Sequence, residues 1–161
     1  MTDQRTLRLA QLQLTKERVD ALVKYQRTVA SHLAEPGHDG WAGHLAFAHA
    51  AGLKESGLDA QDARRLSAVA ADYCGRRLQV IRLEQRLADA RARITAGKAS
   101  KKDADLAARI PSELLRVGDF STFAGMHGPE GLAAVQAREA ELLELHEKLA
   151  RLEGEGHLHR A

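Results

Sequence analysis

Apolar residues recur at heptad spacing through the middle of the chain. One set is spaced by seven residues, and members of a second set follow it by three: Leu66, Tyr73, Val80, Leu87 and Ile94, with Val69, Leu83 and Ala90. This pattern places a continuous apolar seam along a helix. We therefore predict one long central helix over residues 59–96, with Asp59 as its N-cap. At about 1.5 Å per residue this helix would extend roughly 50 Å, so other helices must lie along it.

Helical periodicity and helix-breaking residues predict four further segments on either side of this helix. They are a first helix over residues 6–33, a short helix over 41–54, a second short helix over 100–110 and a C-terminal helix over 129–153. Ser100 and Asp103 have the spacing of a capping box at the start of the second short helix. Residues 111–129 are predicted to be irregular, and residues 154–161 to form a frayed tail.

These segments predict an all-α protein, an elongated antiparallel helical bundle of three long helices plus two short helical connecting segments. The whole chain, residues 1–161, is expected to form a single domain. The second half of the central helix is rich in arginine, and the C-terminal helix is rich in glutamate. We therefore expect the C-terminal helix to pack antiparallel on that half, with its leucines against Val80, Leu83 and Leu87.

Composition limits the classes of function that the chain can serve. Basic and acidic residues nearly balance, at 24 and 22, so the overall charge does not favour nucleic acid as a partner. No apolar stretch is long enough for a membrane span, and the first residues are too polar for a signal peptide. The expected compartment is the cytoplasm, or the periplasm if a leader peptide has been removed. Cys74 is the sole cysteine, which excludes an intrachain disulfide.

Four histidines, His32, His38, His44 and His49, lie in one short window of the sequence. They provide an alternative hypothesis, in which the chain binds a transition metal or haem. His44 and His49 are five residues apart, and this spacing turns them away from each other on a helix. A metal site would therefore have to be assembled by tertiary contacts, and scattered surface histidines remain the preferred interpretation.

Two polar residues interrupt the apolar seams, Gln26 in the first helix and Arg76 in the central helix. We interpret them as a polar core layer that fixes helix register, rather than as a ligand pocket. A buried guanidinium would need a carboxylate or backbone carbonyls as partners. Cys74 stands beside two arginines, but no neighbouring residue completes a catalytic thiol site.

The sequence contains neither a phosphate-binding glycine loop nor a nucleophile elbow. We therefore expect a non-enzymatic helical interaction protein, an adaptor or chaperone-like bundle that could also associate with itself, and no cofactor. The alternative is a small-ligand or metal-binding bundle that uses the region from His32 to His49. In architecture alone, the layout is similar to that of small bacterial helical proteins, including periplasmic metal-stress chaperones built from long hairpins.

Overall fold

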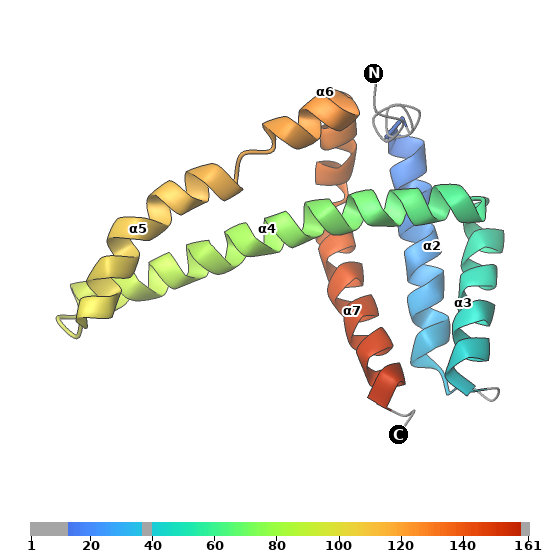
Figure 1. Cartoon of the computed structure of the whole chain (residues 1–161), viewed down its shortest axis with the longest axis horizontal. Helices are drawn as coiled ribbons and strands as arrows, with labels where there is room; N and C mark the ends of the chain where they lie inside the picture. The colour runs from blue at the N-terminus through green and yellow to red at the C-terminus, as the bar shows by residue number, and fades with distance from the viewer. Residues whose placement is uncertain (1–12, 37–39, 159–161) are drawn as a thin grey trace, which may run out of the picture. The chain divides into compact units, whose positions relative to one another are not determined.

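A computed structural model describes residues 13–36 and 40–158 of the chain (Figure 1). Within these residues it contains helices and no strand, which confirms the all-α class. The helices are α2 (Lys16–Ala34), α3 (Gly40–Ser56), α4 (Ala60–Thr95), α5 (Lys101–Val117), α6 (Ser121–Ala137) and α7 (Glu139–Leu158). The more specific prediction, a bundle of three long antiparallel helices joined by two short segments, is not confirmed.

The central helix α4 agrees closely with its predicted bounds. The Asp59 carboxylate accepts a hydrogen bond of 2.7 Å from the Asp62 amide, as expected of an N-cap. Every seam residue named above is buried except Ile94, which is 42% exposed. Ile94 lies in the last turn, where the chain leaves the helix through Gly97 in a left-handed conformation with φ 70°.

Contacts divide the chain into two compact units that share α4. Unit 1 contains Met1–Cys74 and Phe123–Ala161, and unit 2 contains Gly75–Thr122. The first half of α4 therefore belongs to one apolar core and the second half to another. Whether both units unfold in a single transition, as a single domain requires, stays a prediction.

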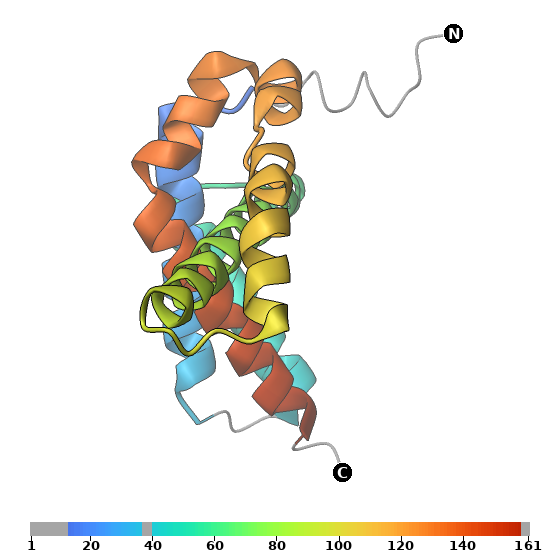
Figure 2. The ribbon, with the colours of Figure 1, turned by 90° about the vertical axis from the view of Figure 1, so that its left-hand side faces the viewer.

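Unit 2 is a helical hairpin made from the second half of α4 and from α5, joined by the short turn visible in Figure 2. Its core contains residues from both helices: Val80, Leu83, Leu87, Ala90, Leu106, Ile110 and Val117. The seam of this half is thus covered by α5, whereas α7 packs on α2. The predicted packing of the C-terminal helix on Val80, Leu83 and Leu87 was therefore wrong.

The chain from residue 111 to residue 129 is helical, where we predicted irregular structure. Helix α5 continues through Pro111 to Val117, and α6 begins at Ser121. Gly128 has non-helical angles, φ 75° and ψ 162°, and separates two parts of α6 just before Pro129. A turn at Arg138 divides the predicted C-terminal helix into α6 and α7, and α7 continues to Leu158, through residues that were predicted to fray.

Helix α5 begins with the capping box that the sequence predicted. The Ser100 hydroxyl accepts from the Asp103 amide, and the Asp103 carboxylate accepts from the Ser100 amide. Arg93 donates to the same carboxylate at 2.8 Å, so one acidic side chain joins the end of α4 to the start of α5. The Arg93 guanidinium, together with the Ser100 amide and hydroxyl, holds the pKa of Asp103 well below its usual range.

We expect this carboxylate to make the hairpin sensitive to acid. Because its pKa is lower in the folded chain than in the unfolded chain, its stabilisation is complete above the ordinary value of 3.8. That stabilisation is lost as the pH falls through the lower, folded pKa. Melting curves at neutral and acidic pH should show a smaller acid-induced loss for Asp103→Asn than for the natural chain. Asp105→Asn is the control and should behave like the natural chain, and equal losses in all three would contradict the prediction.

Unit 1 brings α2, α3, α6 and α7 together with the first half of α4. Gly52 of α3 lies so close to α2 that a Cβ atom placed on it would be 2.8 Å from ring carbon Cδ2 of Tyr25. Gly156 of α7 lies similarly close to the indole ring of Trp41 in α3. These two glycines allow α3 to approach α2 at one end and α7 at the other, because a larger side chain would occupy the same space.

Candidate functional site

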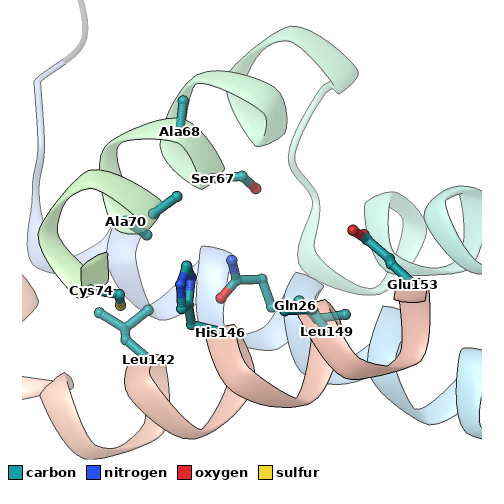
Figure 3. Close-up of a pocket in the computed structure, with 11 residues that line it drawn as sticks. Gln26, Ser67, Ala68, Ala70, Cys74, Leu142, His146, Leu149 and Glu153 are labelled. Carbon is teal, nitrogen blue, oxygen red and sulfur yellow. The ribbon is translucent and has the colours of Figure 1, made fainter. Parts of the chain in front are cut away.

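Three helices of unit 1 enclose a cleft of about 360 Å³ (Figure 3). The lining residues come from α2, from the first half of α4 and from α7: Gln26; Ser67, Ala68, Ala70, Ala71 and Cys74; and Leu142, His146, Leu149, Ala150 and Glu153. Most of these side chains are small or apolar, and a few polar groups stand among them. Small-molecule sites in proteins commonly have this composition and volumes from about 300 Å³ upward.

Gln26 contributes a buried amide to the cleft. Its side chain is 8% exposed, and its oxygen Oε1 has no hydrogen-bond partner within the described chain. In the view of Figure 3 the amide lies between Cys74 and Glu153, in the middle of the cleft. Its burial agrees with the predicted polar core position, but the lining of the cleft also makes this amide available as a recognition group.

Cys74 lies toward one end of the cleft and Glu153 toward the other (Figure 3). Burial, with a further contribution from the charge of Glu139, raises the pKa of the Cys74 thiol to about 11. At neutral pH this sulfur is therefore a protonated thiol, which is a poor nucleophile. The cleft as built suits binding better than nucleophilic catalysis.

A network of polar contacts fixes α7 against its neighbours and thereby positions the cleft. Arg138 pairs with Asp20 of α2 at 2.8 Å and also with Glu141, which in turn pairs with Arg27 of α2. The Tyr73 hydroxyl of α4 donates to Glu139 in the first turn of α7. Since both α2 and α4 hold the start of α7, the positions of His146 and Glu153 are set relative to Gln26.

Ser67, His146 and Glu153 line the cleft but were not predicted to belong to a site. A signal was present, because Leu142, His146, Leu149 and Glu153 are spaced by four, three and four residues along one face of a helix. Two polar residues therefore interrupt an apolar stripe, as Gln26 does in α2. Periodicity alone does not reveal that the two interruptions face the same cleft.

The three described histidines of the window each lie against an aromatic side chain. His32 contacts the edge of the Phe47 ring at a centroid distance of 5.3 Å, and His44 lies beside Trp41 at 6.2 Å. The His49 ring nitrogen Nδ1 is 2.5 Å from the Tyr25 hydroxyl. No group of three or more potential ligands that could hold a metal ion occurs among the described residues, which exclude His38.

Arg76, the second residue of the predicted polar layer, makes its contacts with the chain segment that follows α5. Its side chain is partly exposed, donates to the Asp119 carbonyl at 2.8 Å and lies 5.9 Å from the centre of the Phe120 ring. These are contacts within unit 2, and they satisfy the guanidinium with a backbone carbonyl and an aromatic face. A register-fixing layer that joins Arg76 to Gln26 stays a prediction.

Unit 2 has a basic hollow of about 510 Å³ near the start of α5. Its charged lining residues are Arg86, Arg93, Lys98 and Lys102, with Asp89 and Asp103. Arg93 is paired with Asp103 at 2.7 Å, so part of the positive charge is already neutralised. No aromatic side chain lines this hollow to stack on a base, and the expectation against nucleic acid stays a prediction.

The outer face of α3 is the second candidate surface. The helix contains no Asp, Glu, Lys or Arg between Gly40 and Leu53, and it buries Ala48 and Gly52. On the opposite face Gly43, Ala46, Phe47 and Ala50 are exposed. Phe47 is 64% exposed, and its contact with His32 holds the ring in place.

Comparisons with protein-family models, with curated proteins and with solved structures found no match to this chain. Among the described helices, none is long and apolar enough to cross a membrane.

Proposed function

We propose that the protein is a non-enzymatic helical interaction protein that associates with itself through the outer face of α3. The observation that carries the proposal is the exposed Phe47 ring on a helix with no charged side chain from Gly40 to Leu53. A helix that is apolar on all sides normally has its whole circumference covered. Here α2 contacts one side, and the opposite side is exposed.

A second copy of the chain suits this face better than a partner of opposite charge. The face has no charge with which to select such a partner, but it combines one large projecting ring with neighbouring small residues. Phe47 of each copy could pack over Gly43, Ala46 and Ala50 of the other copy about a two-fold axis. A single pair of helices buries little area for a specific interface, so the dimer should dissociate on dilution.

Phe47→Glu is expected to abolish this association. The substitution places a carboxylate near its own symmetry mate and removes the central aromatic anchor, so the dimer should weaken by more than about tenfold. Sedimentation velocity over a series of concentrations measures the effect. Because Phe47 is mostly exposed, the variant should retain the helicity and melting temperature of the natural chain.

Leu115→Glu is the matched control, since Leu115 is 80% exposed and lies on α5 in unit 2. This variant should associate as the natural chain does. A natural chain that is monomeric at every concentration, or a Phe47→Glu variant that still dimerises, would contradict the proposal. An adaptor or chaperone-like role would then need a partner at another surface.

The protonated Cys74 thiol supports a role without nucleophilic catalysis, and the absence of a metal-ligand group among the described residues favours association over metal binding. We propose the cytoplasm as the compartment.

A further inference from the structure

The cleft between α2, α4 and α7 is independent of the self-association surface. None of its lining residues belongs to α3. Its central group, the Gln26 amide, is buried, and its oxygen lacks a donor within the described chain. An unpaired buried oxygen destabilises the fold, and folded proteins keep few such groups. An unpaired buried oxygen in the lining of a cleft therefore indicates a ligand that donates a hydrogen bond to it.

The electrostatics of the cleft select the charge of such a ligand. Glu153 is the one carboxylate among the lining residues, and no lysine or arginine lines the cleft. The Cys74 thiol is protonated at neutral pH. An anionic ligand would therefore find no fixed countercharge, whereas an ammonium group could pair with Glu153.

The order of groups along the cleft sets the arrangement of the ligand. Cys74 and Leu142 lie toward one end, Gln26 and His146 lie in the middle, and Glu153 lies toward the other end (Figure 3). A matching molecule has an apolar body at the first end, a hydrogen-bond donor in the middle and a cation at the second end. Neighbouring atoms cover Gln26 Oε1 in this structure, so the amide must turn about its last torsion to present that oxygen to the ligand. The turn costs little, because sp³–sp² torsions have broad energy wells.

We propose that this cleft binds a small primary amine whose apolar body carries an N–H donor. The N–H donates to Gln26 Oε1, the ammonium group faces Glu153, and the apolar body packs on Ala70, Leu142 and the Cys74 thiol. The volume of about 360 Å³ limits the ligand to a compact molecule. Ser67 and His146 provide further hydrogen-bonding groups at the sides of the cleft.

Three commercial probes separate these requirements when titrated calorimetrically into the full chain. Tryptamine has the apolar ring, the N–H and the ammonium group; phenethylamine lacks the N–H; indole-3-propionate replaces the ammonium group with a carboxylate. Tryptamine should bind most tightly. Loss of one hydrogen bond should weaken phenethylamine by about five- to tenfold, and loss of the exposed ion pair should weaken indole-3-propionate by about threefold or more.

Two variants connect each preference to one side chain. Gln26→Leu should remove the difference between tryptamine and phenethylamine, and it should fold, because it replaces an unpaired buried oxygen by apolar atoms. Glu153→Gln should remove the preference for tryptamine over indole-3-propionate. Glu147→Gln, on the same helix but outside the cleft, is the matched control and should retain both preferences.

If tryptamine does not bind the natural chain, the proposal is contradicted. It is also contradicted if Gln26→Leu and Glu153→Gln keep the preference for tryptamine over the other two probes. Gln26 would then have only a packing role. Phe47→Glu should bind tryptamine as the natural chain does, because Phe47 lies outside the cleft. Failure of the ligand site and failure of self-association are therefore distinguishable.

Discussion

Val80→Asp is expected to unfold the hairpin of unit 2. Val80 is buried in the core formed by α4 and α5, next to Leu83, Ile110 and Val117. A carboxylate at this position would lose its hydration, and the core around it consists of apolar side chains. We expect a destabilisation of about 3 to 5 kcal/mol, a large share of the stability of an ordinary domain. Circular dichroism should show lower helicity, and the melting temperature should fall.

Ile81→Asp is the control for this experiment, because Ile81 is the next residue of the same helix and is 37% exposed. The carboxylate remains hydrated there, so the change should cost less than about 1 kcal/mol. Equal effects of the two substitutions would show that the register of the seam is wrong. Retained unit 1 signals, such as the Trp41 fluorescence, would show that unfolding is confined to the hairpin.

Gly52→Leu is expected to separate α3 from α2. Even a Cβ atom at this position would lie 2.8 Å from both Tyr25 Cδ2 and Val29 Cγ2, closer than van der Waals contact allows. Both neighbours are buried, and the Tyr25 hydroxyl is held by His49, so neither can move aside freely. We expect a loss of about 3 kcal/mol in chemical unfolding, the upper part of the usual range for an overpacked core.

The matched control is Gly75→Leu. Gly75 is also inside a helix, but no atom would lie within 4 Å of an added Cβ, so only helix propensity changes there. That variant should gain about 0.5 kcal/mol, because glycine is the poorer helix former. A Gly52→Leu variant as stable as the natural chain would show that α2 and α3 are not in close contact.

The sequence by itself determined the features that depend on neighbouring residues. Heptad spacing predicted α4 almost to its ends, and the Ser100–Asp103 and Asp59 caps formed as expected. Both kinds of signal are local, since a helical stripe and a side chain-to-backbone hydrogen bond involve residues a few positions apart. The all-α class follows from the same signals.

A local signal was misleading where a proline suggested the end of a helix. Pro111 lies inside α5, and the helix still continues to Val117. Leu106 and Ile110 before the proline and Val117 after it belong to one core, so burial on both sides compensates for the lost backbone hydrogen bond. Packing of α5 against α4 therefore outweighed the helix-breaking tendency of Pro111. These contacts join residues that are far apart in the sequence, so a short sequence window does not reveal them.

The tertiary structure alone decided which helix covers which face and which polar residues meet. A leucine stripe shows that one face of a helix must be buried, but it does not specify which other helix buries it, because hydrophobic contacts are not directional. The second half of α4 packs with α5, where we had predicted the C-terminal helix. Charge matching was a weak guide, because exposed ion pairs contribute at most about 1 kcal/mol. The convergence of Gln26 with His146 and Glu153 depends on the packing of α7 against α2 and α4, and this contact between distant segments leaves no mark in the spacing of either helix.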